Sequence, residues 1–360
     1  MSNDILKNYQ YNYFRTFEKD RSCVMETVIN VLLIVIILVV VLAIGLKMFF
    51  PKNNKVAFGF FLQLNKNEKE ALLLCKSIRK FGGKLSESKI FLFKYNDKKI
   101  SNYVLDGLKK LNAEIFNVDV NKEMKNFPLA SKVAAAKRAE EISLKKKINN
   151  LIWLDSDTII LDFPSEFILN NDESVAYVPV HHKLIGNNYD KRVDNFWKEL
   201  FKRIAVDEGN LFEMETADGK DKIYPYFNAG HLSVNPRDKI FKKWYYNFIY
   251  NYRDNYFIKY YNRDFKYAIF FHQAILTATI LSNYDKNEIK QLSKKYNYPL
   301  NLHEQINEEN KALQMEDLIT VRYDRYENYF IKKKWGKMID IKNTLKLWID
   351  MIINEGDRNE

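Results

Sequence analysis

The chain has 360 residues, of which 47% are hydrophobic and 29% charged. This composition excludes a disordered tail and is enough to bury one large core or two modest ones. Seven Pro and 11 Gly, against 25 Phe and 23 Tyr, exclude collagen-like and proline-rich proteins. The two cysteines, Cys23 and Cys75, cannot build a disulfide scaffold or a four-ligand zinc site. Any metal ion must therefore be held by oxygen and histidine ligands.

The net charge of +11 comes from 57 Lys and Arg against 46 Asp and Glu. A basic chain can attract nucleic acid, anionic lipid or a phosphorylated substrate. The densest clusters, residues 145–147 and 332–334, hold three lysines each, whereas a nucleic-acid groove gathers many basic residues on one face. We therefore predict no nucleic-acid partner, while a phosphate-bearing small substrate is compatible with the charge.

An apolar run over residues 28–46 follows a polar tail of residues 1–27, and its one polar residue is Asn30. As a helix rising ~1.5 Å per residue, this run matches the ~30 Å hydrocarbon core of a bilayer. We predict a transmembrane anchor over residues 28–50, and a single-pass membrane protein. A cleaved signal peptide is the alternative, because small residues near the end of the run resemble a cleavage site. Flanking Lys and Arg are balanced, so the side of the membrane is not determined.

Residues 51–330 alternate short β-rich apolar runs with helical patterns over their first half. Such alternation predicts an α/β domain in which helices cover a mostly parallel sheet. In the first helix, apolar residues recur at helical spacing and include Cys75, which we interpret as a core residue. The predicted strands are 56–64, 89–95, 113–120 and 151–154, and the predicted helices are 68–81, 101–111 and 131–144.

The second half of this domain is very aromatic, above all between residues 241 and 271. We interpret these rings as ordinary helix packing; a stacking platform for sugars or bases is the alternative. In the last segment, residues 331–360, apolar residues such as Leu345, Trp348 and Ile349 recur at helical spacing. That spacing predicts an amphipathic helix on the domain or on the membrane surface.

The segment Asp155-Ser156-Asp157 directly follows the predicted strand 151–154. The carboxyl ends of parallel strands are where open α/β sheets bind ligands. Aspartates two residues apart can hold a hard divalent cation such as Mn²⁺ or Mg²⁺, which in turn neutralises a diphosphate. We predict such a metal site here. The alternative for this pattern alone is a turn with two solvated aspartates.

Three further segments carry polar and small residues in a suggestive order. Asn228-Ala229-Gly230 separates an aromatic pair from an apolar run, which predicts a turn that a bulky ligand can approach, with Asn228 bonding sugar hydroxyls. The pair His272-Gln273 stands at the predicted start of a helix. Residues 296–303, which end in His303, form a polar and aromatic turn.

In this order the segments resemble the GT-A nucleotide-diphospho-sugar glycosyltransferases, most closely the family 8-like branch of glycogenin and bacterial galactosyltransferases. The resemblance covers roughly residues 55–325 and implies a GT-A, Rossmann-like sheet flanked by helices. The matching pieces are LDSD at 154–157, FNAGHLSVNP at 227–236, HQA at 272–274 and YNYPLNLH at 296–303.

The resemblance also implies a role for each matching residue. Asp155 and Asp157 would bind Mn²⁺ or Mg²⁺ and the donor diphosphate, with Ser156 between them. Asn228, Ala229 and Gly230 would line the sugar and acceptor pocket. Basic residues before this strand, Lys137 and Arg138 together with Lys132, match the place where the family sets a basic residue against the donor. The residues predicted to be catalytic are Asp155, Asp157, His272 and Gln273. Those predicted to bind the donor or the acceptor are Lys137, Arg138, Ser156, Asn228, Ala229 and Gly230.

Two departures from the family pattern stand out. His272 replaces the usual Asp before Gln273, so the donor sugar cannot be carried over. The family's late histidine, a third metal ligand, is matched by Arg322 in this chain. We therefore name His303 as the candidate third ligand, with Asp324 as its alternative.

Together these features predict a metal-dependent glycosyltransferase. It would move a sugar from a nucleoside diphosphate, with UDP as the expected nucleotide, to a hydroxyl of a glycan, lipid or protein in glycan or glycolipid synthesis. The family branch implies retention of anomeric configuration. The alternatives are a non-catalytic, membrane-tethered scaffold that binds sugar nucleotides, and a haloacid-dehalogenase-like phosphatase. The phosphatase pattern needs Thr or Val two places after Asp157, where this chain has Ile159.

Overall fold

The computed structural model describes residues 32–37, 55–325 and 339–357. The chain divides into two units, residues 1–54 and 55–360, and each is described by itself. The described part of the first unit is one short stretch of helix, residues 32–37, with exposed side chains.

The prediction of a single-pass membrane protein is corrected by the structure. Across the described parts of the chain, no helix has the length and apolar character needed to cross a membrane. Of the predicted span, the structure describes residues 32–37 as helix. The rest of the predicted anchor, 28–31 and 38–50, lies outside the described residues.

The second unit is built on a seven-stranded sheet in the order β10-β6-β9-β4-β1-β2-β3. β9 runs antiparallel to its neighbours β4 and β6, and the remaining pairs are parallel. The predicted α/β class with a mostly parallel sheet is therefore confirmed. The strands are β1 (Val56–Leu62), β2 (Lys89–Tyr95), β3 (Ala113–Val118), β4 (Asn150–Asp155), β6 (Val175–Pro179), β9 (Phe227–Val234) and β10 (Ile289–Gln291).

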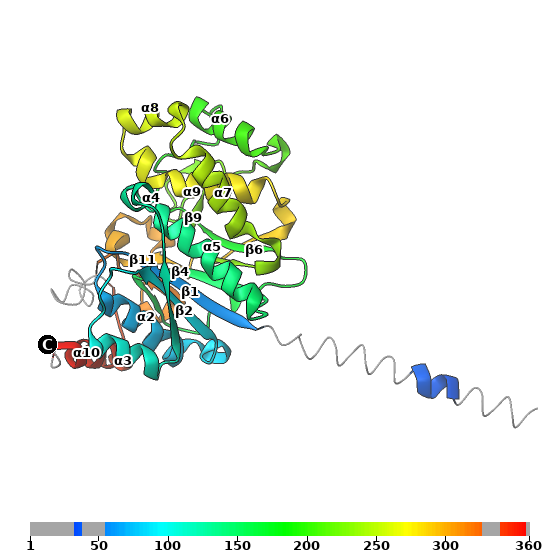
Figure 1. Cartoon of the computed structure of the whole chain (residues 1–360). Helices are drawn as coiled ribbons and strands as arrows, with labels where there is room; N and C mark the ends of the chain where they lie inside the picture. The colour runs from blue at the N-terminus through cyan, green and yellow to red at the C-terminus, as the bar shows by residue number, and fades with distance from the viewer. Residues whose placement is uncertain (1–31, 38–54, 326–338, 358–360) are drawn as a thin grey trace, which may run out of the picture. The chain divides into compact units, whose positions relative to one another are not determined.

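Helices cover both faces of this sheet (Figure 1), because side chains of each strand alternate between two cores. In β1, Ala57 and Phe61 join the core beneath α5, α7 and α9, whereas Phe58 and Phe60 join the core beneath α2 and α3. The helices are α2 (Glu68–Phe81), α3 (Asn102–Lys110), α4 (Lys122–Asn126), α5 (Ala130–Lys145), α6 (Asn195–Ile204), α7 (Ile240–Asn251), α8 (Asn255–Arg263), α9 (Lys266–Leu281) and α10 (Asn343–Asp357).

Local signals account for the ends of several helices. α2 begins after Asn67, whose side chain accepts a hydrogen bond from the backbone N–H of Lys69, and it ends in basic residues. α5 begins after Leu129, whose φ of 59° lies in the left-handed region, and no side chain caps it. A non-glycine residue in that region costs free energy, so the surrounding structure must hold Leu129 in place.

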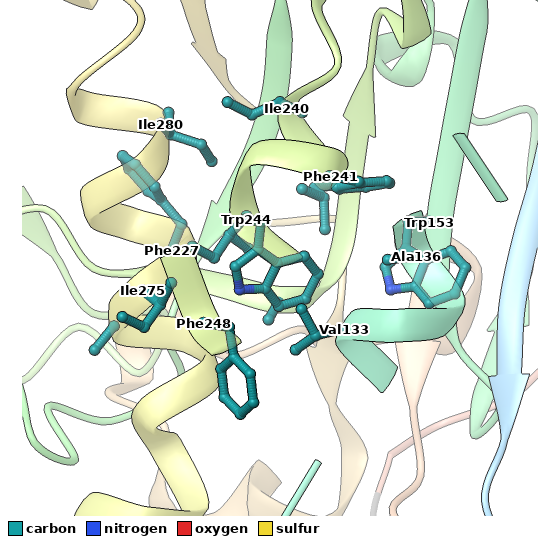
Figure 2. Close-up of a cluster of buried hydrophobic side chains, with 14 of the residues drawn as sticks. Val133, Ala136, Trp153, Phe227, Ile240, Phe241, Trp244, Phe248, Ile275 and Ile280 are labelled. Atoms are coloured by element: carbon teal, nitrogen blue, oxygen red, sulfur yellow. The ribbon is translucent and has the colours of Figure 1, made fainter. Parts of the chain in front are cut away.

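The rings of α6 to α9 form what we call the aromatic layer: Phe196, Trp197, Phe241, Trp244, Phe248, Phe257 and Phe271, all buried. Figure 2 shows its inner part, where Trp244 and Phe248 of α7 lie between α9 and Val133 of α5, and Phe241 lies beside Trp153 of β4. Edge-to-face contacts recur among these rings, such as Phe196 with Phe257 at 5.5 Å. The buried rings of residues 241–271 thus serve helix packing, as predicted.

A second, three-stranded sheet lies beside the first and holds β5 (Thr158–Ile160), β12 (Thr320–Arg322) and β11 (Tyr298–Pro299). β12 pairs antiparallel with β5, which places Arg322 opposite Thr158. α10 packs nearby, with the ring of Trp348 edge-to-face on Phe81 at 4.8 Å. The remaining short elements are β7 (Met214–Glu215) paired with β8 (Lys222–Ile223), and the 3₁₀ turns Gly83–Leu85, Ser165–Phe167, Glu208–Asn210, Pro236–Asp238, Lys286–Glu288, Leu300–Gln305, Glu308–Asn310 and Met315–Asp317.

Candidate functional site

A cleft lies where the parallel strands β1 and β4 end. This is the edge at which open α/β sheets bind ligands. Two of its lining residues follow β1, one ends β4 and two belong to the turn after it. The others come from the start of α5, from α9 and from β12. The lining residues are Gln63, Lys66, Leu129, Lys132, Asp155, Ser156, Asp157, Phe270, His272, Gln273 and Arg322.

Asp155 is the last residue of β4, and its carboxylate faces two cations. The Nζ of Lys132 lies 2.5 Å from Oδ1, and the guanidinium of Arg322 lies 3.9 Å from Oδ2. Burial by itself would raise the pKa of Asp155, but the charges of Lys132 and Arg322 outweigh it and hold that pKa below its ordinary value. Asp155 is therefore ionised at neutral pH.

Asp157 is almost fully buried and also pairs with two cations. Its Oδ2 accepts a hydrogen bond of 2.9 Å from the Nζ of Lys66, and both carboxylate oxygens lie 3.3 Å from the Nε of Arg322. Lys66 donates as well to the backbone carbonyl of Asp324. Burial lowers the pKa of Lys66, but Asp157 and Glu70 outweigh it, so the net shift is upward and Lys66 stays charged.

Arg322 reaches both aspartates because its strand is tied to the turn that carries them. β12 pairs with β5 directly after Asp157, and the backbone N–H of Tyr323 donates to the carbonyl of Asp157 at 3.1 Å. Burial opposes the charge of Arg322, yet Asp157 and Asp155 outweigh that effect and raise its pKa. Its guanidinium is therefore a permanent positive charge between the two carboxylates.

Lys132 lies in the first turn of α5, with 5% of its surface exposed. Burial lowers the pKa of this ammonium, and the charge of Asp155 offsets part of that effect. The cleft thus holds three cations, Lys66, Lys132 and Arg322, against the two carboxylates Asp155 and Asp157.

Gly230 of β9 is needed for this arrangement, because it lies beside Asp155 across the β4–β9 pair. A Cβ at this position would stand 1.9 Å from Oδ2 of Asp155, far inside any allowed contact. Glycine therefore leaves the room that the Asp155 carboxylate occupies. Asn228, Ala229 and Gly230 all belong to the strand β9, which corrects the turn predicted for them.

Gln273 connects α9 to this strand. Its Oε1 accepts a hydrogen bond of 3.2 Å from the backbone N–H of Ala229, and its Nε2 donates to the hydroxyl of Tyr226 at 3.4 Å. The side chain of Asn228 is bonded within β9, where its Oδ1 accepts from the N–H of Gly230 at 2.8 Å. Gln273 lines the cleft itself, while Asn228 and Ala229 are not among its lining residues.

His272 also lines the cleft, beside Gln273. Burial, with a smaller effect of Lys132, lowers the pKa of His272 to about 3, so its ring is neutral at pH 7. Its Nδ1 lies 2.9 Å from the carbonyl of Ile269. His272 and Gln273 lie in the middle of α9, which begins at Lys266, so the prediction that they start a helix was wrong.

A family model described as the Rhodobacterales glycosyltransferase domain matches residues 58–276. The chain belongs to this glycosyltransferase family. The matched range includes Lys66, Lys132, the turn after β4 and Gln273, and it ends before Arg322. The resemblance to glycosyltransferases drawn from the sequence is confirmed.

Several solved structures are similar to this glycosyltransferase. The galactosyltransferase LgtC, in complex with donor and acceptor sugar analogs, is 15% identical, with a TM-score of 0.43 over 81% of this chain and 99% of that one. Core-mannan synthase A from Aspergillus fumigatus, in an Mn/GDP form, is 10% identical, with a TM-score of 0.38 over 67% and 73%. The glycosyltransferase GlyE of Streptococcus pneumoniae TIGR4 is 14% identical, with a TM-score of 0.43 over 85% and 64%. No curated protein matches the chain.

Two basic residues predicted to bind the donor lie away from the cleft of this glycosyltransferase. Lys137 is 3.2 Å from Glu141 and stands over the ring of Tyr245, and Arg138 is 3.3 Å from the same glutamate. Neither lines the cleft, whereas Lys132, one and a half turns earlier on α5, does. Ser156 lines it too, but its hydroxyl donates to the buried Glu70 of α2 at 2.8 Å.

The predicted third metal ligand, His303, is not brought to the aspartates. It lies in the turn Leu300–Gln305, where its Nδ1 is 2.7 Å from the hydroxyl of Tyr298. Among the residues that the structure describes, no three His, Cys, Asp or Glu side chains form a group that could hold a metal ion.

The side chains available as metal ligands therefore do not fit the Mn²⁺ or Mg²⁺ predicted from the sequence. Such an ion asks for about six oxygen ligands, most of them uncharged or negative. Here both candidate ligands, Asp155 and Asp157, are paired with ammonium and guanidinium groups, and Arg322 pairs with both of them. A divalent ion would have to break these ion pairs and would be repelled by three positive charges.

Sequence reasoning missed Lys66, and it noted Arg322 only as a departure from the family. A signal for Lys66 was present, since it follows the first predicted strand and so lies at the same sheet edge as Asp155. Arg322 carried no such signal, because only the pairing of β12 with β5 brings it to the cleft.

Proposed function

We propose that this glycosyltransferase moves a sugar from a nucleoside diphosphate sugar to a hydroxyl acceptor, with the donor diphosphate in the cleft at Asp155. The observation that carries the proposal is the meeting of Lys66, Lys132 and Arg322 at the carboxyl ends of β1 and β4. A diphosphate is doubly charged or more, and ammonium and guanidinium groups bind phosphate oxygens by charge-assisted hydrogen bonds. The family membership supports the transfer of a sugar.

Sugar transfer from such a donor is limited by the charge that develops on the departing diphosphate. Fixed cations that point at the departing diphosphate oxygen stabilise the transition state more than the ground state. Arg322 is fixed by two carboxylates and by the ladder between β12 and β5, and Lys132 by Asp155. The aspartates thus act as supports that orient the cations, and the predicted Mn²⁺ or Mg²⁺ has no part in this proposal.

UDP is the nucleotide we propose, and a glycan, lipid or protein hydroxyl is the acceptor. We also propose that the anomeric configuration is retained. An inverting enzyme needs a carboxylate or another base to take the acceptor proton. The carboxylates lining the cleft within the described chain are Asp155 and Asp157, and both are held by cations. The NMR signal of the anomeric proton in the first-formed product tests this, and an inverted product would contradict it.

The experiment that tests the main proposal is thermal stabilisation of the full chain by UDP, GDP and their sugars, followed by nucleotide release in the presence of simple sugar acceptors. Stabilisation by one nucleotide, lost in Lys132→Met and kept in Lys137→Met, is the expected result. These two lysines lie on the same helix, one in the cleft and one outside it.

Other outcomes separate the alternatives. Binding without nucleotide release in any acceptor mixture would favour the non-catalytic scaffold predicted as the second possibility. A folded protein that no nucleotide or nucleotide sugar stabilises would contradict the proposed function. Release of phosphate from simple aryl phosphates would favour the phosphatase.

A further inference from the structure

Resting on the proposed function, we propose that Lys66, Lys132 and Arg322 replace the divalent cation at the donor diphosphate, so that this glycosyltransferase binds its donor and transfers sugar without a metal ion. The three side chains come from the end of β1, the start of α5 and β12, and they converge on the turn Asp155–Asp157. A protein charge cluster thus occupies the place where the sequence pattern by itself predicts a metal site.

The first step of the argument is the position of Arg322. Its Nε is 3.3 Å from both oxygens of Asp157 and its Nη2 is 3.9 Å from Oδ2 of Asp155. A divalent ion held by the two aspartates would need these carboxylates. The guanidinium therefore competes with such an ion for both of them, and the pairing of β12 with β5 keeps it there.

The second step is that each aspartate already has cationic partners, which a metal ion would have to displace. The Oδ2 of Asp157 is bonded to Lys66 at 2.9 Å, and the Oδ1 of Asp155 to Lys132 at 2.5 Å. Lys132 is buried, so separating it from Asp155 would leave an uncompensated charge inside the protein. Among the described residues, no group of three or more His, Cys, Asp or Glu side chains offers a third protein ligand.

The third step is the chemistry that the cations supply. In the transfer, the bond between the anomeric carbon and the diphosphate oxygen breaks, and its electron pair stays on that oxygen. A new bond forms from the acceptor oxygen to the anomeric carbon, and the acceptor proton passes to the departing diphosphate or to water. The ammonium groups of Lys66 and Lys132 and the guanidinium of Arg322 have several N–H donors each and no acceptor. Together they can therefore bind several phosphate oxygens at once.

The experiment uses the full chain in two conditions, excess EDTA and excess Mn²⁺. Thermal shift first measures stabilisation by UDP and by GDP, and nucleotide release from the donor sugar is then measured in the same two conditions. We expect the same stabilisation and the same release rate in both conditions. A shift and a release rate that vanish in EDTA and return with Mn²⁺ would overturn the inference while leaving the proposed function in place. Absence of binding and turnover in both conditions would contradict the proposed function itself.

A pair of variants sharpens the test. Arg322→His removes the central cation and supplies the metal ligand that the family pattern carries. Release in EDTA should fall by about 10²–10³-fold, as for loss of a transition-state donor, and Mn²⁺ should restore part of it. Arg325→His is the control, because Arg325 is exposed and close in sequence. If Arg322→His behaves like this control in EDTA, Arg322 does not serve the diphosphate and the inference fails.

Discussion

Lys132 and Val133 are neighbours on α5, yet they belong to regions built on different physics. Lys132 enters the charged cleft, where each positive side chain is held by a carboxylate. Val133 enters the core that includes the aromatic layer, where rings and aliphatic groups fill the space without charge. Burying apolar area stabilises the fold, whereas burying charges costs free energy even when they are paired. The comparison teaches that stability and ligand binding are located in different parts of this molecule.

The largest expected effect is on stability in the aromatic layer. Phe248→Ala removes a fully buried ring that contacts Phe127, Tyr252 and Phe271. The free energy of unfolding should drop by about 3–5 kcal/mol, from lost transfer energy and the cavity left behind. Urea unfolding measures it, with the exposed Tyr250→Ala on the same helix as control. A similar loss in both variants would break the comparison.

The next effect is on function in the cleft. Lys132→Met should reduce the rate of nucleotide release by about 10²–10³-fold, because a cation aimed at the departing charge is lost. Its cost in stability should be smaller than that of Phe248→Ala, since Asp155 keeps Arg322 as a partner. Lys137→Met should keep both the rate and the stability, because this half-buried side chain pairs with Glu141 outside the cleft. Equal rates for the two lysine variants would remove Lys132 from the site.

A steric change tests the geometry of the same carboxylate. Gly230→Ala places a Cβ 1.9 Å from Oδ2 of Asp155 and must displace that side chain. A shift of about 1 Å in a catalytic group can cost ~10²-fold in rate. Steady-state nucleotide release measures the effect. Gly209→Ala is the control, since its nearest neighbour, the end of the Asp207 side chain, lies 3.3 Å away.

The smallest effect concerns pH, and it arises in the cleft and not in the aromatic layer. Burial lowers the pKa of His272 to about 3, whereas an unfolded histidine has a pKa of about 6.5. Below about pH 6.5 the unfolded chain binds the proton more readily, so stability present above that pH is lost as pH falls toward 3. Between pH 6.5 and 5 the loss approaches about 2 kcal/mol for this histidine.

Chemical denaturation at pH 7, 6 and 5 measures this loss for the wild type and for His272→Gln. The variant should lose less stability over this range, because its side chain does not titrate. Parallel curves for the two proteins would show that His272 does not carry the effect.

Much of the fold was predictable because its signals are local. The range of α2 was predicted correctly from apolar spacing, and so was that of β2. The start of α9 was missed because its N-cap residue, Phe265, cannot cap the helix with its side chain. The side chain of Asp264 instead accepts a hydrogen bond from the N–H of Lys266. The start of β9 at Asn228 was predicted to be a turn, because Asn, Ala and Gly in sequence are typical of turns. The sequence does not show which residues lie next to them across the sheet.

The sequence alone determined the alternation of strands and helices, the place of Asp155 and Asp157 at a strand end, and the family to which the chain belongs. These depend on periodicity and on the order of short segments. The tertiary structure decided which cations meet the aspartates. Helical register turns Lys132 toward the cleft and Lys137 toward Glu141, and the pairing of β12 with β5 delivers Arg322 from 165 positions beyond Asp157. Charges act through space, so no spacing along the chain reveals that they have replaced a metal ion.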